Sequence, residues 1–334
     1  MINSFFFIKL FKNITKTILL IISKSSILVG GQAIIEGVMM RVPGAFAAAV
    51  RQPNGKIVTI KEDFVSYADQ YKALRLPIIR GIVGLFEALK IGVNTLNWSA
   101  DLSFEAAAEN KPNKFVDFII TFFSFSLAIS LFFIAPIGLT SWLSNDEQNP
   151  VFFNILSGII RIIFFLLYLF LISIMKDVYI LFQYHGAEHK AVYTFESGKN
   201  LIVENTHNFP TQHPRCGTSF LFLIMIVAII SFSMLDLIIM YYVGELTLII
   251  RLISHIPFIP IVAGLGYETL KLTAKYNHLL FFKMLSKPGM ALQKITTKMP
   301  SDKQVEVALE ALKCAFDYDT IKYEGKQHIA EAIG

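Results

Sequence analysis

The sequence predicts a mainly α-helical, polytopic membrane protein: a bundle of about four spans with a small N-terminal cytoplasmic β-hairpin module and a helical C-terminal tail. Three observations support this fold class. Hydrophobic residues make up 54% of the 334, which is more than a soluble core of this length needs. Four apolar runs approach or exceed the roughly 20 residues that cross a bilayer. Lysine and arginine gather in particular connections between these runs.

The predicted spans contain almost no charge. They cover residues 118–143, 151–175, 217–235 and 252–267. Only Arg161 interrupts the second run, and the other three have no charged residue. The fourth run contains two prolines and two glycines, which leaves a kink or a partly re-entrant course open.

Two further helices are predicted at the membrane surface. Residues 76–96 include Arg80, Glu87 and Lys90, which favour an amphipathic helix over a span. Residues 1–29 carry four lysines and no acid, as expected for a basic interfacial helix on an anionic leaflet. The same pattern is similar to a signal peptide, but no small-residue cleavage site follows it closely.

Polar modules flank the bundle. In residues 30–114, two strand-like runs surround Pro53-Asn54-Gly55, and Asn-Gly between alternating residues is a strong hairpin signal. The preceding glycine-rich segment, GGQAIIEGVMMR, lacks the Gly-Lys-Ser/Thr of a P-loop, so phosphate binding is not supported. In the tail, residues 269–334, Ser301 and Gln304 fit a capping box. Apolar residues recur after it at helical spacing, which predicts a docked amphipathic helix.

The distribution of basic residues predicts the orientation. Residues 1–114 contain 14 Lys and Arg, residues 183–215 contain three and the tail after Glu268 contains ten, whereas the connections 144–150 and 243–245 contain none. Both termini and the loop 183–216 within the bundle 115–268 are therefore expected in the cytoplasm, with the protein in the inner (cytoplasmic) membrane. The lipid bilayer is the expected partner, and no nucleic acid is. Two isolated cysteines favour a reducing compartment over a disulfide framework.

The segment YHGAEHKAVY follows the second run and predicts a metal site. His185 and His189 lie four residues apart, so on a helix both imidazoles face the same side and can share an ion. Glu188 lies between them, and the order His-x-x-Glu-His is that of inverzincin proteases, in which the glutamate acts as base.

Two further segments contribute candidate ligands at the same membrane face. His213 and Cys216 precede the third run, where helix N-terminal amides favour the metal-binding thiolate. Glu268 ends the fourth run, and a downstream glutamate is the third ligand of the inverzincin pattern. Zinc, or another divalent transition metal, is the expected ion.

Other interpretations of these residues stay open. Lys190 and Arg215 are candidate catalytic or substrate-binding residues, or merely basic residues of a cytoplasmic loop. Cys216 could be a small buried side chain. Three charges lie towards the opposite ends of the spans, and we expect them to form a structural, charge-paired set, with an ion or substrate path as the alternative. They are Arg161, Asp236 and Arg251.

Five motifs in order resemble the YqhQ-like family of bacterial multipass membrane proteins. They are GGQAIIEGVMMR, YHGAEHKAVY, HPRCGTSF, GYE and PGMALQKITTKMPSDKQVEVALEALK, between about Gly30 and Phe316. The resemblance implies a membrane location and a predicted metal-dependent enzyme of unknown reaction. The polar motif positions that it carries onto this chain are Glu36, Arg41, Tyr184, His185, Glu188, His189, Lys190, His213, Arg215, Cys216 and Glu268.

Together these features predict a membrane-embedded metal-dependent hydrolase that acts on a membrane peptide or a lipid-linked ester, with Glu188 as base. In this hypothesis His185, His189 and either Glu268 or the pair His213 and Cys216 hold the metal. If both histidines bind together with His213 and Cys216, the shell is closed and the site structural. The alternative is therefore a non-catalytic, metal-stabilised scaffold or assembly factor that recruits a cytosolic protein, and a transporter is a third class.

Overall fold

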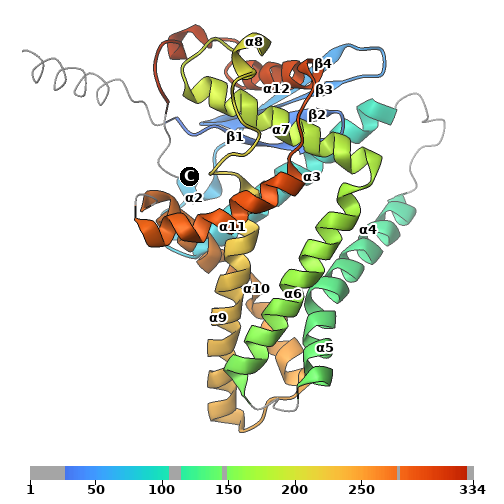
Figure 1. The fold of residues 1–334 in the computed structure, drawn as a ribbon, viewed down its shortest axis with the longest axis vertical. Helices are drawn as coiled ribbons and strands as arrows, with labels where there is room; N and C mark the ends of the chain where they lie inside the picture. Colours follow the sequence, from blue (N-terminus) through green and yellow to red (C-terminus); the bar gives the residue numbers. More distant parts are fainter. Residues whose placement is uncertain (1–26, 105–113, 145–148, 277–278, 329–334) are drawn as a thin grey trace, which may run out of the picture.

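The computed structural model describes residues 27–104, 114–144, 149–276 and 279–328. The fold has two parts, a stalk of apolar helices and a head built on an antiparallel sheet (Figure 1). We call the helices within residues 114–173 and 217–275 the stalk, and the sheet of residues 30–63 with the helices within residues 176–206 and 302–315 the head. The basic helix expected over residues 1–29 lies almost entirely outside the described residues.

The stalk confirms the predicted spans. Its elements are α4 (Lys114–Ile129), the π-helical turn η2 (Ser130–Ile134), α5 (Ala135–Leu143), α6 (Pro150–Ser173), α9 (Gly217–Val243) and α10 (Leu248–Lys275). Within the described residues, four helices are long and apolar enough to cross a membrane, and the first combines α4, η2 and α5. Helix α10 continues through Pro257 and Pro260, so the fourth span is a helix and not a re-entrant loop.

A buried polar cluster joins three spans. Asp236 of α9 accepts hydrogen bonds from Arg251 (3.1 Å) and His255 (2.8 Å) of α10, and from Asn154 of α6 (2.7 Å). The side chains of Asp236 and Arg251 are fully buried. The expected charge pair is thus present. Arg161 does not pair with a carboxylate in the described part of the chain, and its guanidinium lies 5.0 Å from the ring centre of Phe133.

The head contains a four-stranded antiparallel sheet in the order β1-β2-β3-β4. Its strands are β1 (Gly30–Ile34), β2 (Gly37–Val42), β3 (Ala45–Arg51) and β4 (Ile57–Asp63). The predicted hairpin is β3–β4, in which Arg51 pairs with Ile57 and Gly55 takes a φ of 86° in the turn. The glycine-rich segment, which we did not predict as strands, forms β1 and β2 around Glu36.

Helices from two later parts of the chain complete the head. Helix α7 (Lys176–Glu196) contacts β1, and α12 (Asp302–Ala315) contacts β2, β3 and α7. The capping box of Ser301 and Gln304 is present at the start of α12, as predicted. The short helix α8 (Val203–Thr206) lies beside α7. One hydrophobic core therefore joins the N-terminal module, the histidine segment and the tail.

Further helices connect stalk and head. They are α2 (Tyr67–Gln70), η1 (Lys72–Arg75), α3 (Ile79–Phe104) and α11 (Leu280–Thr296). The short helix η3 (Ile321–Tyr323) belongs to the head, where Tyr323 packs against the hydrophobic core. Helix α3 confirms the helix expected over residues 76–96 and extends it. Helix α11, which we did not predict, lies across the top of the stalk below the head (Figure 1).

Candidate functional site

The two histidines lie on α7, which is separate from the second span. Helix α6 ends at Ser173, and α7 begins at Lys176 with its course changed by the extended backbone of Met175. The segment after α11 lies against α7 at Gly186, where an added Cβ would lie 2.1 Å from the carbonyl oxygen of Lys298. The N–H of Lys298 donates to the carbonyl of Phe182 at 2.8 Å. Glycine is required here because backbone occupies the space of a side chain.

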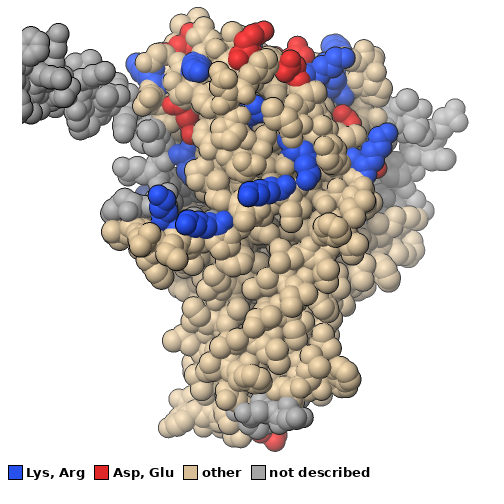
Figure 2. Space-filling view, in the orientation of Figure 1, with Lys and Arg blue, Asp and Glu red and all other residues tan. Residues whose placement is uncertain are grey.

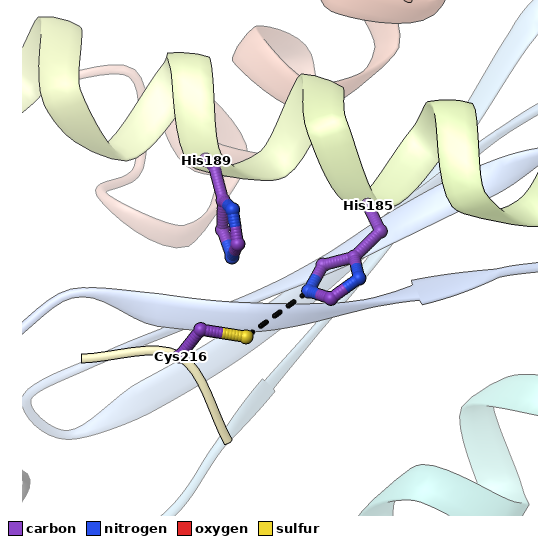
Figure 3. A group of neighbouring side chains, drawn as sticks. All are labelled: His185, His189 and Cys216. Carbon is purple, nitrogen blue, oxygen red and sulfur yellow. Dashed lines mark hydrogen bonds between the residues drawn. The ribbon is translucent and has the colours of Figure 1, made fainter. Parts of the chain in front are cut away.

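Three predicted residues converge below α7 (Figure 3). One ligand atom each from His185, His189 and Cys216 lies within 4.8 Å of the others. Nε2 of His185 lies 3.2 Å from Sγ of Cys216. The two imidazoles point from α7 towards the thiol, which comes from the loop before α9 (Figure 3).

Backbone carbonyls orient both imidazoles. Nδ1 of His185 lies 2.8 Å from the carbonyl oxygen of Thr296, and Nδ1 of His189 lies 2.5 Å from that of Thr211. Because a carbonyl only accepts, each Nδ1 carries a proton, so in the neutral form of the ring Nε2 presents its lone pair.

Nε2 of His189 is buried and makes no hydrogen bond within the described residues. Burial lowers the pKa of His189, although the nearby Cys216 opposes the shift, so the ring is neutral at pH 7. An orphaned, neutral Nε2 that faces a thiol is suited to bind a metal.

Cys216 is the N-cap residue of α9, as expected from its place before the third span. Its Sγ accepts a hydrogen bond from the N–H of Thr218 at 3.5 Å and lies 3.3 Å from the Thr218 hydroxyl oxygen. The positive end of a long helix favours the thiolate form that binds metals.

His213 lies beside this group but directs its nitrogens elsewhere. Its ring centre is 5.7 Å from that of His189. Nδ1 accepts from the N–H of Arg215 at 3.3 Å, and Nε2 lies 3.4 Å from the carboxylate of Glu196. Burial lowers the pKa of His213 to about 4. In this arrangement His213 is a neighbour of the three convergent residues and supplies no fourth ligand atom.

Glu188 is buried between α7 and the sheet. The residue is 6% exposed, and the N–H of Gly31 in β1 donates to its carboxylate. Burial raises the pKa of Glu188, although His185 and His213 act in the opposite direction. The carboxyl group therefore keeps its proton to a higher pH than an exposed glutamate does.

The two predicted basic residues have structural partners. Lys190 is 2% exposed, and its ammonium donates to the carbonyls of Thr206 and His207, both at 3.2 Å, which fixes the end of α8. Arg215 forms an ion pair with Glu196. Neither contact directs a cation towards the three convergent residues.

The structure does not bring Glu268 into the group. Its carboxylate accepts from Nε of Arg80 at 2.7 Å and from the N–H of Ile78 at 3.3 Å. Helix α3 crosses α10 closely here, since an added Cβ on Gly81 would lie 2.8 Å from Tyr267. The glutamate is therefore held by an ion pair on α3, because this close crossing brings Arg80 to it.

Some residues that support the group were not foreseen. Gln293 of α11 accepts from the N–H of His213 at 2.7 Å and donates to its carbonyl at 2.8 Å. Glu196 lies seven residues after His189, two turns along the same face of α7, and that spacing could have identified it. The carbonyls of Thr211 and Thr296 carry no sequence signal, because every residue has one.

The donor types limit what the group can hold. Two imidazole nitrogens and one cysteine sulfur are the ligands that zinc and related divalent transition metals prefer. His185, His189 and Cys216 could therefore hold one such ion.

Comparison with known proteins identifies the family but no activity. Residues 76–318 match the family model described as "Protein of unknown function (DUF1385)". The chain is 31% identical over 299 residues to "Uncharacterized protein YqhQ" of Bacillus subtilis (strain 168), across 84% of this chain and 90% of that protein. No solved structure matches the chain. The resemblance to the YqhQ-like family is thus confirmed, and the chain belongs to the DUF1385 family of proteins of unknown function.

Proposed function

We propose that the chain is a membrane-embedded, zinc-dependent hydrolase whose site lies at the cytoplasmic membrane boundary. The observation that carries this proposal is the convergence of His185, His189 and Cys216, with both Nδ1 atoms bonded to backbone carbonyls. Carbonyl-bound Nδ1–H groups of this kind are the usual support of zinc-binding histidines.

The number of ligands favours catalysis over a purely structural metal. Structural zinc sites have four protein ligands, whereas catalytic sites have three and keep a position for water. The nitrogens of His213 are engaged by Arg215 and Glu196, and Glu268 is engaged by Arg80. Zinc at such a site activates water and polarises a carbonyl.

Glu188 is the base in this proposal. Glu188 is close enough to His185 for the two side chains to interact electrostatically. Burial raises the pKa of Glu188, which suits a group that accepts a proton and then releases it. The hydrogen bond from Gly31 fixes the carboxylate against β1.

The position of the site suggests the substrate. Cys216 immediately precedes a span, and α11 borders the group between stalk and head. A peptide or an ester attached to a lipid could reach this level of the molecule from the bilayer.

Two variants test the proposal, with one control. His185→Ala should lose zinc, and Glu188→Gln should keep it, whereas His207→Ala changes a half-exposed histidine outside the group and should behave as wild type. In cells that lack the protein, the substrate should accumulate among membrane peptides or lipid-linked esters. Wild type and His207→Ala should remove it, and Glu188→Gln should not. A zinc content of His185→Ala equal to that of wild type would contradict the proposal.

A scaffold is the second candidate, because the three residues connect α7 of the head to the start of α9 in the stalk. A metal there would join the two parts, while the head recruits a cytosolic protein. In that case Glu188→Gln would keep both zinc and full function.

A further inference from the structure

Helix α11 lies in the most basic part of the chain. Residues 269–301 contain six lysines and no Asp or Glu, whereas the formal net charge of all 334 residues is only +5. Within the described residues, Lys283, Lys287 and Lys294 make no ion pair. A segment with such a charge excess fits an anionic partner.

The surface of α11 combines this charge with exposed apolar side chains. Leu280 and Phe281 at its start are 73% and 70% exposed, and Met284 is 57% exposed. All three lysines are exposed, while Leu292 on the opposite side is buried. Large apolar groups beside lysines are typical of a helix that lies in a membrane interface.

The position of α11 matches the level of lipid headgroups. It packs on α9, α10 and α6, which are membrane-spanning helices. Figure 2 shows Lys and Arg side chains in a row where the apolar stalk meets the head, over the region of α11 in Figure 1. Phosphates of the leaflet would lie at this level, because the stalk below it is apolar.

We propose that α11 is an interfacial helix whose lysine row, Lys283, Lys287 and Lys294, binds the phosphate groups of an anionic phospholipid leaflet. The apolar side chains at the start of α11 enter the acyl region beside the stalk. Electrostatic attraction between lysines and anionic lipid strengthens such binding.

The same helix contacts residues of the candidate site, so lipid binding to α11 also affects the neighbouring loop 211–216. Gln293 holds the backbone of His213 through two hydrogen bonds, and the carbonyl of Thr296 holds the imidazole of His185. Anionic lipid therefore steadies the loop 211–216. This effect does not require a bound metal, so it is independent of the proposed hydrolase.

Hydrogen exchange tests the proposal in the full-length, metal-free protein in nanodiscs. Phosphatidylcholine discs are compared with discs that also contain phosphatidylglycerol. For wild type, we expect exchange several-fold slower in α11 and in the loop 211–216 when phosphatidylglycerol is present. The combined variant Lys283→Gln, Lys287→Gln, Lys294→Gln should lose this difference.

A matched control removes the same charge from the head. Lys56→Gln, Lys303→Gln, Lys326→Gln changes three exposed lysines away from α11 and should keep the wild-type response. Equal exchange of wild-type α11 in both discs, or an unchanged response of the α11 variant, overturns the lipid contact. Slower exchange in α11 with no change in the loop overturns the coupling. Exchange of α7 in phosphatidylcholine checks that both variants fold.

Discussion

At the scale of single residues, Gly186 determines how closely the segment after α11 approaches α7. A Cβ there would lie 2.1 Å from the Lys298 carbonyl, and the neighbouring Thr296 carbonyl orients His185. The segment after α11 can therefore lie this close to α7 only because Gly186 has no side chain, and the orientation of the His185 imidazole depends on that segment.

Gly186→Ala should lower the thermal unfolding midpoint in detergent and weaken zinc binding. Displaced backbone costs about 1–3 kcal/mol of stability, and loss of a hydrogen bond behind a ligand lowers metal affinity by roughly 10–100-fold. Gly84→Ala is the control, because an added Cβ there meets nothing within 4 Å. Wild-type zinc affinity in Gly186→Ala would refute the supporting role of this segment.

The residues that converge could be predicted from the sequence, but what orients them could not. Histidine spacing on a helix and a cysteine before a span pointed to His185, His189 and Cys216. Sequence could not show that Arg80 engages Glu268 or that Glu196 engages His213. The first contact depends on how α3 crosses α10, and the second on how the loop before α9 lies against α7.

At the scale of elements, a buried polar cluster connects three of the apolar helices of the stalk. The carboxylate of Asp236 contacts Arg251, His255 and Asn154 from two neighbouring helices. Complete burial and mutual pairing favour a structural role for this cluster over an ion path.

Asp236→Ala should strongly destabilise the stalk, because it leaves the buried Arg251 without its carboxylate. Breaking a buried pair costs about 3–5 kcal/mol. The unfolding midpoint of purified protein measures this loss, and Asp101→Ala, at an exposed position of α3, should leave it unchanged. An Asp236→Ala variant as stable as wild type would show that this cluster does not stabilise the packing of the stalk helices.

Elements with a strong local signal were predictable, and those that depend on tertiary contacts were not. The Asn-Gly turn of β3–β4 and the capping box of α12 determine local backbone directly. The β1–β2 turn instead contains Glu36 at a φ of 49°, a conformation with no glycine to signal it. The second span was predicted to end at residue 175, close to the end of α6, but the histidines were expected in a loop, and the sequence did not show that residues 176–196 form a further helix, α7.

At the scale of the whole molecule, the head gathers both flanking modules on one end of the stalk (Figure 1). This arrangement agrees with the expectation that the basic segments share one side of the membrane. Composition predicted that grouping, but not the shared core of β2, β3, α7 and α12, which requires contacts between distant parts of the chain.

An epitope tag at Gly55, in the β3–β4 turn, should be hidden from antibody in intact spheroplasts. A tag at Gly244, between α9 and α10, should be accessible from outside. Permeabilised cells provide the control, since both tags should then react. Labelling of the Gly55 tag in intact spheroplasts would show that the head lies outside the cell, opposite to the predicted orientation.

X-ray absorption at the zinc edge tests the central claim most directly, because it reports the atoms bound to the metal. Zinc-loaded wild type should show one sulfur at about 2.3 Å with nitrogen or oxygen ligands at about 2.0–2.1 Å. Cys216→Ser should remove the sulfur, and Cys314→Ser, which changes the other cysteine in the core of the head, should leave it. A protein that binds no zinc, or a sulfur signal that persists in Cys216→Ser, would contradict the account.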